Sequence, residues 1–127
     1  MTIVDDEMST IADVFEAAAE LLELHGWSTG VYETPTGRMC ALGALRRAAG
    51  WHHGDRVDVG GYDVPDYGGR IRRADTARLI LEFHLNKGDA NLITTEWNDH
   101  VAGSADVVID TFKHVAKEIR NEICVAP

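Results

Sequence analysis

The stretch from Ser9 to Trp27, STIADVFEAAAELLELHGW, decides the fold. Ser9 or Thr10 is a suitable N-cap at its start, and Gly26 supplies the left-handed stop that commonly ends a helix. Between them, apolar side chains recur at helical spacing: Ile11, Val14, Phe15, Ala18, Leu21 and Leu22. The stretch therefore predicts an amphipathic helix that buries one face, with Trp27 as a core residue just beyond its end.

Three further helices are predicted along the chain. One runs from about residue 39 to 49, and a second begins between residues 71 and 75 and reaches about residue 86. The apolar residues of this second one cover more than one stripe, so we expect it near the centre of the bundle. Ser104 caps the last helix, whose apolar residues share one face.

Glycine and turn residues mark the segments between these helices. Residues 28–39 suit a short hairpin or an ordered loop, and residues 57–64 suit a small hairpin around Gly60-Gly61. We predict a mainly α fold, a compact bundle of about four helices with one or two short β-hairpins. It forms a single domain over residues 1–127, with residues 1–8 and 125–127 frayed and residues 51–69 as an irregular insertion. The expected shared core comprises Trp27, Leu45, Leu81, Trp97, Phe112 and Ile119.

Composition excludes several classes of protein. A formal net charge of -9 repels phosphate backbones, which argues against nucleic-acid binding. No apolar run approaches the roughly 20 residues that a membrane span needs, and the acidic start from Met1 to Glu7 does not resemble a signal peptide. We therefore expect a cytoplasmic protein, in a bacterial or phage-infected cell, that keeps Cys40 and Cys124 as thiols.

No cofactor or metal is predicted from the spacing of potential ligands. The pair His52-His53 lies near Asp55 and Asp58, but the chain has no Cys-x-x-Cys pair, no HExxH motif and no calcium loop. The glycine-rich stretches also lack the setting of a phosphate-binding loop.

Cys40 is the first candidate for chemistry, at the expected N-terminus of the second helix. The positive end of the helix dipole lowers the pKa of a thiol there and favours the nucleophilic thiolate. The alternative is a buried cysteine that packs as a small hydrophobic residue where two helices cross.

The segment containing Asn98, Asp99 and His100 is the second candidate. A thiolate nucleophile needs a base, usually histidine, oriented by an asparagine or aspartate, and these three residues supply those types. The alternative is that Trp97 anchors the segment in the core while Asn98 and Asp99 hydrogen-bond backbone groups at a turn.

A third group of residues suits binding. Trp51, Tyr62 and Tyr67 lie in the irregular insertion, and aromatic side chains of this kind anchor protein interfaces. The nearby cluster of Arg70, Arg72 and Arg73 suits solvated helix surface or a small anionic ligand.

Several short motifs occur together: Gly26-Trp27, then Cys40-Ala41-Leu42-Gly43-Ala44-Leu45, then Trp97-Asn98-Asp99 ahead of a helix with Asp106-Val107-Val108. This combination resembles a group of small proteins from actinobacteria and their bacteriophages that has no known activity. The likeness covers about residues 11–116. It implies an actinobacterial or phage origin and implies nothing about mechanism.

The leading hypothesis is a non-enzymatic module that binds another protein or a second copy of itself. The alternative is a small cysteine-dependent hydrolase or transferase that uses Cys40 with His100.

Overall fold

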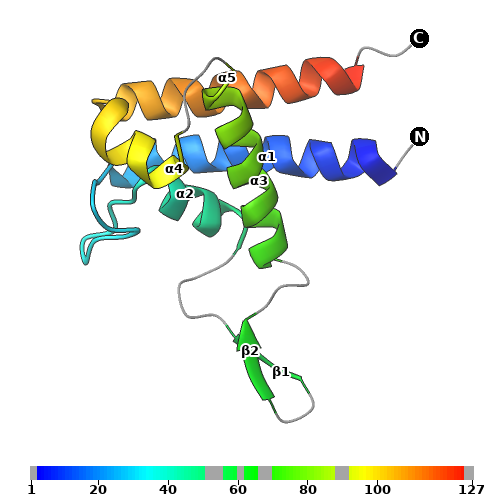
Figure 1. The fold of residues 1–127 in the computed structure, drawn as a ribbon, viewed down its shortest axis with the longest axis horizontal. Coiled ribbons are helices and arrows are strands. Elements are labelled where there is room, and N and C mark those ends of the chain that lie inside the picture. Colours follow the sequence, from blue (N-terminus) through cyan, green and yellow to red (C-terminus); the bar gives the residue numbers. More distant parts are fainter. Residues whose placement is uncertain (1–2, 51–55, 60–61, 66–69, 88–91, 125–127) are drawn as a thin grey trace.

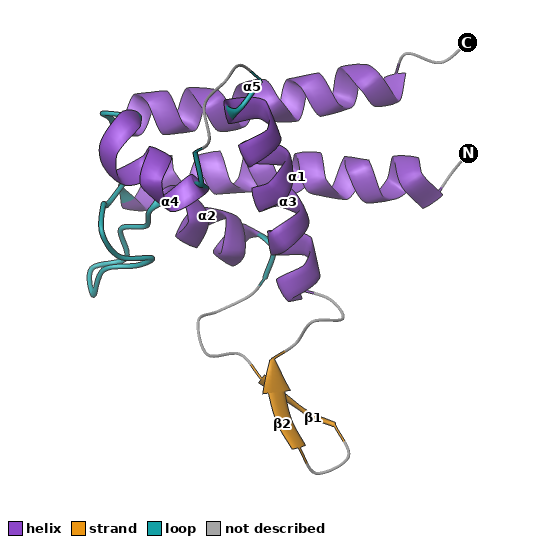
Figure 2. Cartoon of the chain, in the orientation of Figure 1, coloured by secondary structure: helices purple, strands orange, loops and turns teal. Residues whose placement is uncertain are grey.

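The computed structural model describes residues 3–50, 56–59, 62–65, 70–87 and 92–124, and it confirms the mainly α prediction (Figures 1 and 2). The helices are α1 (Ile3–His25), α2 (Ala41–Ala48), α3 (Arg70–Leu85), α4 (Thr94–Glu96), the π-helix η1 (Trp97–Val101) and α5 (Ala105–Cys124). Two strands, β1 (Arg56–Val59) and β2 (Tyr62–Pro65), pair antiparallel with Val57 opposite Val64.

The first and last helices form the base of the fold. Figure 1 shows α1 and α5 lying side by side and running in opposite directions. The rings of Phe15 and Phe112 meet edge to face between them, with centroids 5.6 Å apart, and both side chains are fully buried. α1 starts at Ile3 rather than at the predicted cap, Ser9 or Thr10.

Ion pairs fix the outer edge of the α1–α5 pair. The Arg120 guanidinium contacts Glu16 at 2.8 Å and also contacts Asp13, and Lys113 contacts Glu23 at 3.1 Å. The hydrogen bonds from Arg120 hold the pKa of Glu16 below its usual value. These groups are well exposed, so each pair stabilises the fold by less than about 1 kcal/mol.

One hydrophobic core joins the four longer helices. Five residues of the predicted core are buried in it: Leu45, Leu81, Trp97, Phe112 and Ile119. Trp27, the sixth, is half-buried and packs against the same cluster. The burial of these side chains confirms the apolar faces that the sequence predicts.

The prediction that α3 is central is wrong. Ala74, Ala77 and Leu81 form its buried stripe, at helical spacing. On its other faces Leu79 is 57% exposed and Phe83 is 78% exposed. The other described elements pack on one side of α3 only. They cover the stripe of Ala74, Ala77 and Leu81 and leave the second apolar stripe exposed.

The segment between α1 and α2 is an ordered loop rather than a regular hairpin. Met39 makes single bridges to Trp27 and to Glu33, which close residues 28–38 into a loop. None of the helices in the described part of the chain is long and apolar enough to span a bilayer.

Candidate functional site

The π-helix η1 brings a polar side chain into the core. Its wide turn is closed by the amide of Ala102, which donates to the carbonyl of Trp97 over 2.8 Å, five residues back. The neighbouring residues Trp97 and Asn98 are both turned inward, at 4% and 1% exposed. Wide turns of this kind occur often at functional sites, so the role of Asn98 needs an explanation.

Asn98 fastens three segments of the chain together. Its Oδ1 accepts hydrogen bonds from Trp27 Nε1 at 2.6 Å and from the amide of Ala41 at 2.8 Å. Its Nδ2 donates to the carbonyl of Ser28 at 3.0 Å and to Asp99 Oδ1 at 2.9 Å. The side-chain amide thus has two acceptor and two donor bonds, its full capacity. Of the two sequence interpretations, the hydrogen bonds confirm the one in which Asn98 binds backbone groups.

Asp99 and Gly43 complete the attachment of the loop at residues 28–39. Asp99 Oδ1 accepts from the amide of Gly30 at 3.0 Å, and this hydrogen bond holds the pKa of the carboxyl below its usual value. The carbonyl of Tyr32 lies so close to α2 that a Cβ atom on Gly43 would be 2.0 Å from its oxygen. Glycine at position 43 is therefore what lets the loop reach the helix.

Cys40 is the N-cap of α2, as its sequence position predicts. Its Sγ accepts a hydrogen bond from the amide of Gly43 at 3.3 Å, and the residue is 3% exposed. Burial raises the pKa of the thiol, and the backbone amides of Gly43 and Leu42 only partly oppose this. The direction is opposite to the lowered pKa that the nucleophile hypothesis requires.

The structure brings together some of the four candidate catalytic residues. Cys40 and Asp99 line one open depression of about 470 Å³, together with Thr95 and the loop residues Gly30, Val31 and Tyr32. His100 is exposed and does not line that depression. Asn98 does not line it either, and its side-chain amide already makes the four hydrogen bonds described above. In the part of the chain that is described, the thiol is hydrogen-bonded to backbone amides and to no histidine.

We expect the Cys40 thiol to react slowly with an alkylating reagent in the native state. In a Cys124→Ser background, which leaves a single thiol, native alkylation at neutral pH should be at least ~10-fold slower than in denaturant, because the thiol is buried and protonated. Mass spectrometry against time gives both rates. Fast alkylation that rises with pH and disappears in a His100→Ala variant would contradict this expectation and establish the enzymatic alternative.

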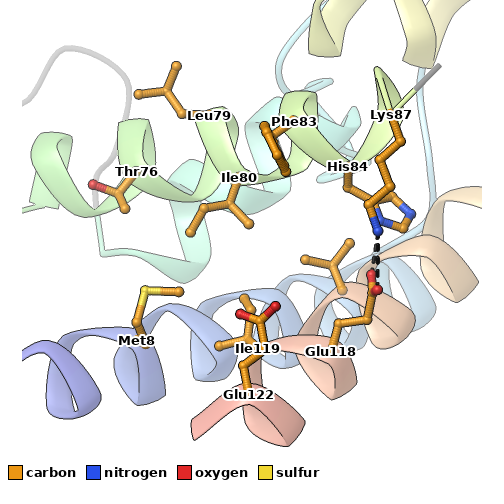
Figure 3. A pocket seen from close by; sticks show the side chains of 11 residues that line it. Met8, Thr76, Leu79, Ile80, Phe83, His84, Lys87, Glu118, Ile119 and Glu122 are labelled. Carbon is orange, nitrogen blue, oxygen red and sulfur yellow. Dashed lines mark hydrogen bonds and ion pairs between the residues drawn. The ribbon is translucent and has the colours of Figure 1, made fainter.

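A groove between α3 and the α1–α5 pair was not predicted from the sequence (Figure 3). It encloses about 380 Å³ and is mainly apolar, and its lining includes Met8, Leu79, Ile80, Phe83 and Ile119. Figure 3 shows Phe83 and Ile80 reaching down from α3 toward Met8 and Ile119. The only sequence signal for it is the second apolar stripe of α3.

Titratable side chains gather at one end of this groove. His84 Nδ1 lies 3.0 Å from Glu118 Oε1, and His114 Nε2 lies 3.4 Å from the same oxygen. Lys87 donates to Glu118 Oε2 at 3.2 Å and is the main cause of the lowered pKa of Glu118. Burial, the largest influence, lowers the pKa of His84. The spacing of His114 and Glu118 on one helix face was visible in the sequence, but the approach of His84 from α3 was not.

The structure describes only part of the predicted binding residues. Trp51 and Tyr67 lie outside the described residues, and the side chains of Tyr62 in β2 and Arg70 in α3 are likewise not described. Arg72 is exposed on α3. Arg73 donates from Nη1 to the carbonyl of Ala49 at 2.9 Å, a contact that ties α3 to the end of α2.

Comparison with known proteins gives one match. Residues 6–118 match the model of a family described as a family of unknown function, DUF6197. No curated protein and no solved structure matches the chain.

Proposed function

The chain belongs to DUF6197, a family of unknown function, and we propose that it is a non-enzymatic protein-binding module. In this proposal the groove between α3 and the α1–α5 pair takes an amphipathic helix of another protein, with basic side chains beside its apolar face.

The exposure of Phe83 and Leu79 carries the proposal. Phe83 is 78% exposed and Leu79 is 57% exposed, although both line the groove. Covering a large apolar side chain contributes about 1.5–3 kcal/mol, so the two together form a strong anchor for a partner.

The dimensions of the groove suit a short helical segment. Three lining residues of α3, Thr76, Ile80 and Phe83, recur at helical spacing, and Lys87 follows just beyond the end of the helix. At about 1.5 Å per residue, the helical residues from Thr76 to Phe83 extend over about 10 Å, or two helical turns. The enclosed volume of about 380 Å³ is also within the range of about 300–1,000 Å³ typical of binding pockets. A helix that presents apolar anchors at every third or fourth residue fits such a groove.

Charge favours a basic partner over a second copy of the chain. Glu118 and Glu122 line the groove against a single cation, Lys87, in the described part of the molecule. The whole chain carries a formal charge of -9, so two copies repel each other while a basic helix is attracted.

The enzymatic alternative, Cys40 acting with His100, has weaker support. The buried thiol with its raised pKa favours a structural role as the cap of α2. Binding through Trp51, Tyr62 and Tyr67, or through Arg70, Arg72 and Arg73, remains a separate prediction from the sequence.

A synthetic helix tests the proposal. The probe is a fluorescent amphipathic peptide of about 14 residues with leucines on one face and lysines on the other, which is long enough to cover the groove. We expect saturable binding by fluorescence anisotropy, weakened at least ~10-fold by Phe83→Asp, because the anchor is replaced by a charge that must be desolvated.

Leu24→Asp is the matched control, since Leu24 is 77% exposed on α1 and outside the groove. It adds the same charge and should leave the affinity unchanged. An affinity that Phe83→Asp leaves unchanged, or that both variants strengthen equally, would show attraction to overall charge only and would overturn the proposal. A dimer of the chain itself that Phe83→Asp dissociates, measured by analytical ultracentrifugation, would assign the groove to a second copy and overturn the proposal.

A further inference from the structure

Three side chains from two helices converge at the end of the groove. His84 comes from α3, while His114 and Glu118 lie four residues apart on α5 and therefore share a face. One ligand atom from each lies within 4.8 Å of the other two. Two imidazoles and one carboxylate are a ligand set that binds zinc in proteins, with a fourth position left open.

The separations are close to those that a metal ion imposes. Bonds of about 2.0–2.1 Å at a tetrahedral zinc place neighbouring ligand atoms about 3.3 Å apart. Glu118 Oε1 is already 3.0 Å from His84 Nδ1 and 3.4 Å from His114 Nε2. Only the two histidine nitrogens have to approach each other, and the side chain of His114 is 59% exposed, which leaves room for its ring to turn.

The buried nitrogen of His84 lacks a satisfactory partner. Its Nδ1 is shielded from solvent and forms no hydrogen bond within the described residues. It lies at ion-pair distance from Glu118 Oε1, but the direction of the contact does not suit an N–H donor. A cation between the two atoms accepts a lone pair from each and satisfies both.

The second carboxylate oxygen is held from the other side. Lys87 Nζ binds Glu118 Oε2 at 3.2 Å, which leaves Oε1 directed at the two histidines, as Figure 3 shows for His84. Contacts of this kind orient a ligating carboxylate in metal sites.

We propose that His84, His114 and Glu118 form a binding site for one divalent transition-metal ion, with Zn²⁺ the best match. The argument for this site does not depend on what occupies the groove, but His84 and Glu118 also line the groove, so a bound metal lies next to the apolar anchors. Nitrogen ligands make it selective against Ca²⁺ and Mg²⁺, which prefer oxygen ligands.

Titration of the full chain with Zn²⁺ in a calorimeter tests the site. We expect one Zn²⁺ per chain, a rise in Tm with Zn²⁺ concentration, and no such effect of Ca²⁺ or Mg²⁺. Co²⁺ in place of Zn²⁺ should show the visible absorption of a tetrahedral complex. His114→Gln, which changes an exposed side chain, should weaken binding by about 10- to 100-fold or more, as should Glu118→Gln.

Two further variants locate the bound metal. His100→Gln removes an exposed histidine outside the cluster and should leave Zn²⁺ affinity unchanged. A His52→Gln/His53→Gln double variant should also bind normally. Zn²⁺ binding that survives His114→Gln and Glu118→Gln but is lost in the double variant would overturn the proposal, as would the absence of Zn²⁺ binding by the wild-type chain.

Discussion

Replacing Asn98 with alanine will lower the free energy of unfolding by about 3–4 kcal/mol, because it leaves buried polar groups without partners. The amide of Ala41 and the indole N–H of Trp27 both lose their acceptor, and the carbonyl of Ser28 loses its donor. Each orphaned group costs about 1–3 kcal/mol, reduced where water enters. Urea denaturation followed by circular dichroism measures the change. Asn121→Ala, at an exposed position of α5, is the control and should change stability by less than about 0.5 kcal/mol.

Asn98→Asp separates the hydrogen bonds from the simple loss of side-chain volume. One oxygen of the introduced carboxylate still accepts from Trp27 and Ala41, but the other faces the carbonyl of Ser28 and the carboxylate of Asp99. We expect this near-isosteric variant to be as unstable as Asn98→Ala at neutral pH. Protonation relieves the repulsion, so its deficit relative to the wild type should shrink as the pH falls. A variant as stable as the wild type at neutral pH would show that the donor bonds of Nδ2 are unimportant.

Gly43→Ala is the second change for which we expect a large effect, and its sign is opposite to the usual rule. Alanine in a helix interior is normally more stable than glycine by about 1 kcal/mol. Here the added methyl group would lie 2.0 Å from the carbonyl oxygen of Tyr32 and 2.8 Å from its carbonyl carbon. Both are backbone atoms, so the loop has to move away from α2. We expect a loss of about 2–4 kcal/mol in the free energy of unfolding, comparable to other severe overpacking.

Gly37→Ala serves as its control in the same loop. Gly37 has a φ of +93° and no atom within 4 Å of the added methyl group, so this variant carries only the strain of a left-handed backbone, about 1–2 kcal/mol. The discriminating measurement is the loop itself. Amide resonances of residues 28–33 should shift widely in Gly43→Ala and little in Gly37→Ala. A neutral or stabilising Gly43→Ala would mean that the loop does not rest on the helix.

The apolar faces of the helices could be predicted from the sequence, because residues that are buried on one face of a helix recur at the helical period. Phe15 and Phe112 lie on such faces, and both are fully buried. Phe83 lies on a comparable stripe and is mostly exposed. Periodicity identifies a face that can be covered, but it does not say whether the same chain covers it. The groove was therefore beyond prediction, although the residues that form it were not.

The polar residues show the same limit in another form. Asn98 was expected to bind backbone groups, but its partners lie 57 and 70 residues away and no local pattern identifies them. The π-helical turn that directs Asn98 inward has no sequence signature either. Likewise, His114 and Glu118 share a helix face by spacing alone, whereas His84 joins them only because α3 crosses α5 at that point.

The pairing of α1 with α5 also determines the order in which the chain can fold. The contact of Arg120 with Glu16 joins residues 104 positions apart, and the two helices lie at opposite ends of the described sequence. A ribosome makes α1 well before α5, yet the apolar face around Phe15 has its main partner in α5. Until then that face stays exposed to aggregation or to chaperones. The closure of so long a loop should also make folding slower than for a helical protein held together by local contacts.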